Sequence, residues 1–550
     1  MKRKQIISLL TAMVLTAGTL SGCGSNLAKA AQRTDDICTE AAAPSADMGT
    51  CEEPCEYVEP GVYVETSDVE CIEEACCESE ESAPKASVKS YLDDIYDTPS
   101  VTNPDPGSEE YSDIEEVGFK SAKRSPLSTF AADVDTASYS NMRRMLNDGY
   151  SVYNLPEGSV RIEELVNYFS YDYNGPKGRD PFGVNTVIGD CPWNENAKLL
   201  SIGLKTEDID FEDTPDSNLV FLIDVSGSMF SDDKLPLLQD AFCMLVDELS
   251  EKDRVSIVTY AGSDSIVLEG ESGLRKRAIK HAINNLEAGG STNGSVGITT
   301  AYELAEDYFI KGGNNRVILA TDGDLNVGLT SVDELENLIS EEKESGVFLS
   351  VLGFGTGNIK DNKMETLADK GNGNYAYIDS IKEAEKVLVK ELSANFLTVC
   401  KDVKFQVEFN PETVKKYRLI GYSNRTMANK DFDDDSKDGG EIGAGHSVTA
   451  LYELVLEEDF HDTILDLNIR FKRPSSDESE LLTYPVDYSA YKKNPSDDFH
   501  FQSAVAEFGL IASNSEYPEN ADLDNVQRIL EQISLDDEYK EEFYEIVCKQ

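Results

Sequence analysis

The stretch FLIDVSGSMF, Phe221–Phe230, decides the fold of this chain. It begins with apolar residues that are typical of a buried strand, and it then turns polar within two positions. An aspartate, Asp224, is followed by two serines at alternate positions, Ser226 and Ser228. A hard divalent cation prefers oxygen ligands in a near-octahedral array, and one carboxylate with two hydroxyls can supply three of them from one side. The stretch therefore predicts a strand that ends in a cation site.

The sequence around this stretch alternates strands and helices. From Ser217 to about Phe396, near-continuous Val/Ile/Leu runs such as NRVILAT and VFLSVLGFG are separated by amphipathic helical segments. This pattern predicts an α/β fold, a doubly wound and mostly parallel sheet with helices on both faces. In such sheets ligands bind at the carboxyl ends of the strands. We therefore expect the cation site to lie at this edge of the sheet.

Two later loops offer oxygen ligands at equivalent places. Thr292 lies in the Gly-rich segment AGGSTNGS before a helix, and Asp322 follows the strand in LATDGDLN. With the first stretch, they give two carboxylates and three hydroxyls, which suit Mg²⁺ or Mn²⁺ and leave Ca²⁺ open. The alternative is that these residues only cap helices and turns, as Ser, Thr and Asp often do.

Taken together, the three segments resemble the von Willebrand factor type A (VWA) domain and its metal ion-dependent adhesion site. The pattern DxSxS, then a threonine, then an aspartate in a TDG turn is matched at Asp224, Ser226, Ser228, Thr292 and Asp322. The resemblance implies that these residues bind the metal and that a partner protein adds an Asp or Glu carboxylate. The regions on both sides of the domain resemble those of a bacterial family of VWA lipoproteins.

The N-terminus reads as a targeting segment. MKRKQ is basic, the next residues are apolar over a length too short to span a bilayer comfortably, and LSGC resembles a bacterial lipobox. Residues 1–23 are thus expected to be a lipoprotein signal peptide, with Cys23 lipidated and the chain anchored to the cell membrane outside the cytoplasm. An ordinary cleaved signal peptide is the alternative. Residues 24–125 are acidic and lack hydrophobic periodicity, which predicts a disordered tether.

The regions that flank residues 217–396, the segment that resembles a VWA domain and is here called the VWA domain, have a different pattern. Residues 126–216 predict helices followed by strands, residues 397–498 show the period-two alternation of half-buried antiparallel strands, and residues 499–550 predict helices. We expect the strands on the two sides to pair in one β-sandwich into which the VWA domain is inserted.

Charge and composition exclude some classes of function. The chain has 550 residues, of which 49 are basic and 104 acidic, and its net charge of −55 argues against nucleic-acid binding. The expected function is cation-dependent capture of a protein partner, with no enzymatic activity and no small-molecule substrate. An assembly or scaffold factor for cell-envelope complexes is the alternative. A metal-dependent hydrolase would need a general base, and the three loops contain no histidine and no additional glutamate.

Overall fold

The computed structural model describes residues 108–132, 135–209, 215–261, 264–289, 295–323, 332–437, 439–458, 463–474, 476 and 478–550. All of them belong to the second of the two compact units into which the chain divides, Leu92–Gln550. The predicted signal peptide with Cys23, residues 24–107 of the predicted tether, and Thr292 lie outside the described residues. The prediction of a disordered tether is wrong for its last part, because residues 108–125 are described and include the paired strand β1 (Lys120–Ser121). Within the described part of the chain, no helix has both the length and the apolar character needed to cross a membrane.

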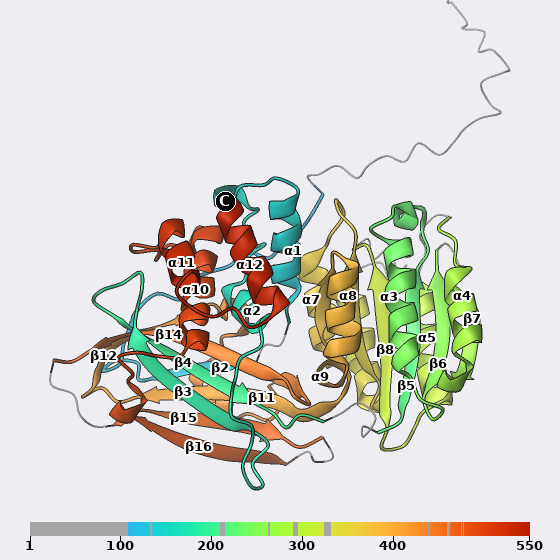
Figure 1. Ribbon diagram of the computed structural model, residues 1–550. Helices are drawn as coiled ribbons and strands as arrows, with labels where there is room; N and C mark the ends of the chain where they lie inside the picture. Colours follow the sequence, from blue (N-terminus) through green and yellow to red (C-terminus); the bar gives the residue numbers. More distant parts are fainter. Residues whose placement is uncertain are drawn as a thin grey trace, which may run out of the picture. The chain divides into compact units, whose positions relative to one another are not determined.

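The middle of the chain forms a six-stranded sheet in the order β10-β9-β8-β5-β6-β7, of which Figure 1 labels β8, β5, β6 and β7. Its strands are β5 (Ser217–Asp224), β6 (Arg254–Tyr260), β7 (Asp264–Ser272), β8 (Asn314–Thr321), β9 (Phe348–Phe354) and β10 (Tyr375–Ile378). All neighbours are parallel except β7, which pairs antiparallel with β6 at one edge. The prediction of a mostly parallel sheet is confirmed.

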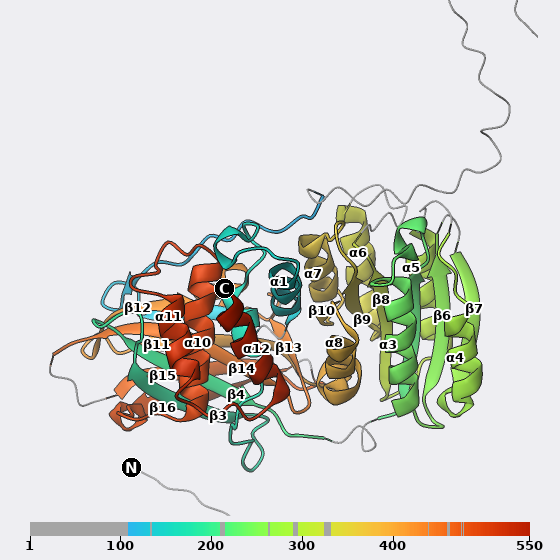
Figure 2. The ribbon, with the colours of Figure 1, turned by 45° about the horizontal axis from the view of Figure 1, so that its top comes forward.

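Helices cover both faces of this sheet because both faces of its strands are apolar. In the fully buried strand β5, Leu219, Phe221 and Ile223 face one core, and Val220 and Leu222 face the other. The helices are α3 (Leu235–Glu248), α4 (Lys276–Asn284), α5 (Ser295–Asp307), α6 (Val332–Glu342), α7 (Asp361–Lys370), α8 (Ile381–Glu385) and α9 (Leu392–Phe396). Residues of α3, α4 and α8 belong to the first core and residues of α5, α6 and α7 to the second (Figure 2).

Strands from both sides of the VWA domain form two antiparallel sheets, in the orders β1-β12-β14-β4-β3 and β13-β11-β15-β16, with β2 also paired to β11. Their bounds are β1 (Lys120–Ser121), β2 (Leu127–Ala131), β3 (Gly183–Asp190), β4 (Lys198–Lys205), β11 (Thr398–Phe409), β12 (Val414–Ile420), β13 (Gly440–Gly443), β14 (Ser447–Leu456), β15 (Thr463–Lys472) and β16 (Ser479–Asp487). Leu200 of β4 lies opposite Tyr452 of β14, and Phe130 of β2 opposite Phe405 of β11. These four side chains share one core, which confirms the expected sandwich.

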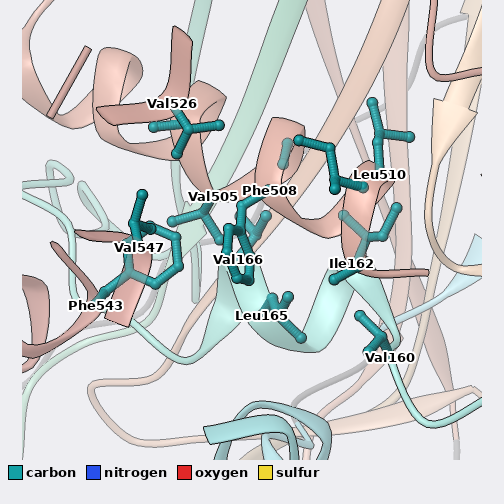
Figure 3. Packing of buried hydrophobic residues seen from close by; sticks show 14 of the residues in the cluster. Val160, Ile162, Leu165, Val166, Val505, Phe508, Leu510, Val526, Phe543 and Val547 are labelled. Carbon is teal, nitrogen blue, oxygen red and sulfur yellow. The ribbon is translucent and has the colours of Figure 1, made fainter. Parts of the chain in front are cut away.

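A helical layer covers the outer face of the first of these sheets. It consists of α1 (Ala137–Asn147), α2 (Ile162–Asn167), α10 (Asp497–Ala512), α11 (Leu523–Leu530) and α12 (Glu538–Lys549). Figure 3 shows Leu165 and Val166 of α2 packed among Val505, Phe508 and Phe543 of the C-terminal helices. Residues of β4 and β14 belong to the same core. The segments before and after the VWA domain therefore form one folded module, here called the flanking module.

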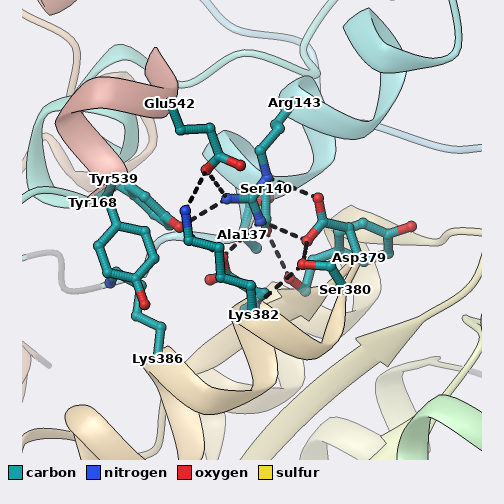
Figure 4. A network of polar contacts seen from close by, with 12 residues as sticks. Ala137, Ser140, Arg143, Tyr168, Asp379, Ser380, Lys382, Lys386, Tyr539 and Glu542 are labelled. Atoms are coloured by element: carbon teal, nitrogen blue, oxygen red, sulfur yellow. Dashed lines mark hydrogen bonds and ion pairs between the residues drawn. The ribbon is translucent and has the colours of Figure 1, made fainter. Parts of the chain in front are cut away.

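Two buried arginines join the flanking module to the VWA domain. Arg143 of α1 donates hydrogen bonds to Asp379 at 2.5 and 2.8 Å, and it reaches Glu542 of α12 at 3.0 Å (Figure 4). It also donates a hydrogen bond to Glu383 at 2.7 Å. The Tyr168 hydroxyl also donates to Glu383, at 2.7 Å. Asp379 and Glu383 lie at the end of the VWA sheet and at the start of α8, so the arginine links three parts of the fold.

The second arginine, Arg161, lies just before α2. It contacts Glu164 of its own helix and donates to Asp361 of α7 at 2.5 Å, and Glu365 lies 3.8 Å away. The side chains of Arg161, Glu164 and Asp361 are at most 3% exposed. We call the contacts of Arg143 and Arg161 the junction network, which holds helix α7 and the segment that follows β10 against the flanking module.

Candidate metal site at the carboxyl edge of the VWA sheet

Asp224 is the last residue of β5 and is fully buried. Its carboxylate accepts hydrogen bonds from the backbone N–H of Ser226 at 2.8 Å and from the Thr321 hydroxyl at 3.3 Å. Burial, with a contribution from the charge of Asp322, raises the pKa of Asp224 to about 6, although these two hydrogen bonds act in the opposite direction. The fold thus holds a carboxylate in a place where its negative charge is poorly solvated.

The two serines lie in the turn that follows. Ser226 is buried and Ser228, in the short 3₁₀ turn Gly227–Phe230, is exposed. Their hydroxyl oxygens are 2.8 Å apart. Two ligands on adjacent vertices of an octahedron around Mg²⁺ lie about 3.0 Å apart, given metal–oxygen distances of about 2.1 Å. The two hydroxyls are at ordinary O–H···O hydrogen-bond distance, and this distance is also close to that between adjacent ligands of an octahedral cation, so one cation could bind both with little movement.

The third loop brings Asp322 to the same edge from the neighbouring strand β8. Thr321 holds the turn together, because its hydroxyl bonds Asp224 and accepts a hydrogen bond from the Gly323 N–H at 3.2 Å. Gly323 has φ +101°, and a Cβ there would lie 2.5 Å from the Asn358 carbonyl oxygen. Only glycine fits this position without strain, which explains the TDG sequence.

Lys234 also reaches this edge. The residue precedes α3, and its ammonium group lies 2.8 Å from the Asp322 carboxylate. The lysine side chain is 4% exposed and the aspartate side chain is fully buried. Neither Lys234 nor Thr321 was predicted from the sequence to belong to this site. One signal was available for the lysine, because a positive charge at the first turn of a helix opposes the helix dipole and calls for another partner.

The fourth predicted position, Thr292, belongs to residues 290–294, which the structure does not describe. The residues on both sides of that gap are at the edge. Gly289 donates a backbone hydrogen bond to Val225 at 2.8 Å. A Cβ on Gly297, in the first turns of α5, would lie 3.0 Å from Tyr260 and 3.4 Å from Leu222. The placement of Thr292 itself remains a prediction.

The structure thus brings together four of the five predicted metal ligands. We call Asp224, Ser226, Ser228 and Asp322, together with Lys234, the edge site. Its donors are carboxylate and hydroxyl oxygens, which suit Mg²⁺ or Mn²⁺ rather than a soft metal. Among the described residues, no group of three or more His, Cys, Asp and Glu side chains is arranged to hold a metal. A cation here would depend on hydroxyl oxygens as well as on carboxylates.

Comparisons with known protein families agree with this architecture. The family described as von Willebrand factor type A domain matches residues 218–390, and the family described as von Willebrand factor matches residues 105–201. The family described as the C-terminal part of the uncharacterised protein YfbK matches residues 394–464 and 457–550. The matches cover the VWA domain and the segments on both of its sides.

Alignments with individual relatives cover more than half of the chain. The uncharacterised protein YfbK of Escherichia coli K12 is 41% identical over 470 residues, which cover 80% of this chain and 81% of that protein. The uncharacterised protein sll0103 of Synechocystis is 25% identical over 334 residues, or 57% of this chain and 76% of that protein. Among solved structures, a von Willebrand factor type A protein from Catenulispora acidiphila aligns with a TM-score of 0.41 and 12% identity, covering 69% of this chain and 91% of that one. This chain belongs to the bacterial family of VWA-domain proteins that includes YfbK.

Proposed function

We propose that the chain is a lipid-anchored binding protein outside the cytoplasm that captures a protein partner through a divalent cation at the edge site. VWA domains are found in proteins of the interaction and adhesion class. The observation that supports the proposal is the convergence of Asp224, Ser226, Ser228 and Asp322 at one edge, where one cation could bind both serine hydroxyls with little movement. The anchor would be Cys23, by its resemblance to a lipobox.

Each residue of the edge site would have its own role in binding the cation. Asp224, Ser226 and Ser228 would hold Mg²⁺ or Mn²⁺, with Asp322 and Thr292 completing the set from neighbouring loops. The bound cation would supply positive charge that accepts an Asp or Glu carboxylate from the partner. Such a bridge matters for this chain, because a net charge of −55 would otherwise repel an acidic ligand.

An exposed aromatic side chain lies at the rim. Phe230, two residues after Ser228, is 65% exposed. Aromatic residues next to a polar anchor point commonly carry part of the binding energy of a protein interface. We assign Phe230 to the surface that the partner covers, so that the partner would offer an apolar contact close to its carboxylate.

The test is capture of the partner by crosslinking on intact cells. Wild-type chain, Asp224→Ala and the control Asp253→Asn are compared with and without a chelator. Asp253 is a matched control because it is also buried and accepts backbone hydrogen bonds, from Ser217 and Ser250, at the opposite edge of the same sheet. We expect capture by the wild type and the control only, and only without the chelator. Equal capture in all samples would contradict the proposal.

The identity of the captured protein decides between two roles. A component of the envelope would indicate an assembly or scaffold role, and a host or matrix protein would indicate adhesion. Both roles use the edge site in the same way, so the chelator and the Asp224→Ala variant test them equally.

A further inference from the structure

Lys234 is the one feature of the edge site that cation binding does not by itself require. Its ammonium group is buried and lies 2.8 Å from Asp322, a predicted metal ligand. Its backbone is fixed as well, because its N–H donates to the Ser231 carbonyl at 3.0 Å and its carbonyl accepts the N–H of Leu238 at 2.8 Å. A cation at the start of α3 opposes the helix dipole, so its position depends on the carboxylate.

The aliphatic part of the Lys234 side chain packs closely against the backbone of a neighbouring loop. Its stem passes over Gly355, where a Cβ would lie 2.3 Å from both Cγ and Cε of the lysine. Gly355 has φ +74°, and its carbonyl accepts a hydrogen bond of 2.7 Å from the buried Tyr377 hydroxyl. The stem is thus packed against this loop, and the side chain is only 4% exposed while its ammonium group contacts Asp322. The contact is therefore a fixed part of the edge and not one position of a mobile surface lysine.

We propose that Lys234 is a built-in positive charge that weakens cation binding at the edge site and strengthens the hold of the bound cation on an external carboxylate. The inference rests on the proposed function and concerns how the site is tuned. Asp224 and Asp322 carry two negative charges, which alone would neutralise a divalent ion. The lysine cancels one of these charges, so a bound cation keeps a net positive charge for the ligand.

This charge balance predicts opposite changes in two affinities when Lys234 loses its charge. The cation should bind more tightly, because a buried like charge is removed from its neighbourhood. The external carboxylate should bind more weakly, because the cation is then more fully neutralised by the chain. A lysine that only holds the fold together would give neither pattern, since its removal would loosen Asp322 and weaken both.

The experiment uses the full chain and two variants of Lys234. Lys234→Gln keeps a hydrogen-bond donor toward Asp322 without the charge, and Lys234→Met removes both. Lys540→Met is the matched control, because Lys540 is another buried lysine paired with aspartates, Asp498 and Asp536, in the C-terminal helices. Free Mn²⁺ is measured by electron paramagnetic resonance during titration of each chain. We expect at least about ten-fold tighter Mn²⁺ binding for both Lys234 variants and no change for the control.

The second readout is titration of N-acetyl-aspartate amide into the Mn²⁺-loaded chains. Water-proton relaxation reports the water that the carboxylate displaces from the metal, and we expect about ten-fold weaker binding to Lys234→Gln than to the wild type. If the wild type binds Mn²⁺ but Lys234→Gln binds it equally or more weakly, the inference about Lys234 is overturned and the proposed function is not. A wild type that binds no Mn²⁺ would overturn the inference and the proposed function together. If Lys234→Met does not fold, Lys234→Gln decides.

Discussion

The edge site and the junction network both bury acidic side chains, but they neutralise them differently. At the junction, the planar guanidinium groups of Arg143 and Arg161 contact two or three carboxylates each. At the edge, the ammonium group of Lys234 contacts Asp322, while the donors to Asp224 among the described residues are neutral, the Ser226 N–H and the Thr321 hydroxyl. The junction carboxylates have permanent cationic partners, whereas the described part of the chain offers Asp224 none.

This difference distinguishes buried carboxylates that stabilise the fold, at the junction network, from buried carboxylates that are available to bind a ligand, at the edge site. Arginine is always charged and binds carboxylates through a rigid fork, so it suits a permanent joint between modules. Lysine is a single point charge, and hydroxyls can either hydrogen-bond one another or bind a metal. Ser226 and Ser228, now bonded to each other at 2.8 Å, can turn their lone pairs to a cation. The two regions should therefore respond to substitution in opposite ways.

The largest effect is expected at the junction. Arg161→Met should destabilise the chain by about 3–5 kcal/mol, because Glu164 and Asp361 would be left buried without their cation. Urea unfolding measures the loss. Arg275→Met serves as the control, since its ion pair with Glu271 is 65% exposed on the arginine side. A loss below about 1 kcal/mol would show that the junction is not held by this charge.

At the edge site, a substitution of the buried charge should stabilise the metal-free chain instead of destabilising it. Asp224→Asn should stabilise the metal-free chain by about 1–3 kcal/mol at neutral pH, because the buried carboxylate with a pKa of about 6 is costly to ionise. The folded-state pKa lies above the unfolded value, so this gain should vanish when the pH falls below about 4, where the carboxyl is protonated in both states. Thermal unfolding in a chelator measures it. Destabilisation at neutral pH would place Asp224 with the structural carboxylates.

Cation binding should also depend on pH. A protonated carboxyl cannot serve as a ligand, so the affinity for Mn²⁺ should fall about ten-fold for each pH unit below the Asp224 pKa of about 6. Calorimetric titrations at about pH 5 and pH 7 compare the two regimes. An affinity that stays constant between them would mean that Asp224 is not a ligand.

The smallest effect is expected at the rim. Phe230→Ser removes an aromatic ring that is 65% exposed and is not itself a predicted metal ligand, so it should weaken partner capture by about 1 kcal/mol, or five-fold. It should leave Mn²⁺ affinity and stability unchanged. Phe309→Ser, which alters another exposed phenylalanine of the VWA domain, is the control. Equal capture by wild type and Phe230→Ser would remove Phe230 from the binding surface.

The sequence was sufficient for the local features and insufficient for the contacts between distant segments. The apolar run before Asp224 and the TDG turn at Asp322 predicted strand ends at one edge, since parallel strands bring their carboxyl ends together. Period-two alternation predicted the flanking strands and suggested that they pair. No periodicity indicated that Lys234 meets Asp322, or that Arg143 meets Asp379 across 236 residues, because such contacts depend on tertiary packing.

The most direct test of cation binding at the edge site is calorimetric titration with Mg²⁺ and with Mn²⁺. The wild-type chain is compared with Asp224→Asn and with the control Asp253→Asn. The account predicts saturable binding of one ion by the wild type and the control, and an affinity at least about a hundred-fold weaker for Asp224→Asn. Binding that survives in Asp224→Asn, or no binding by the folded wild type, would contradict it.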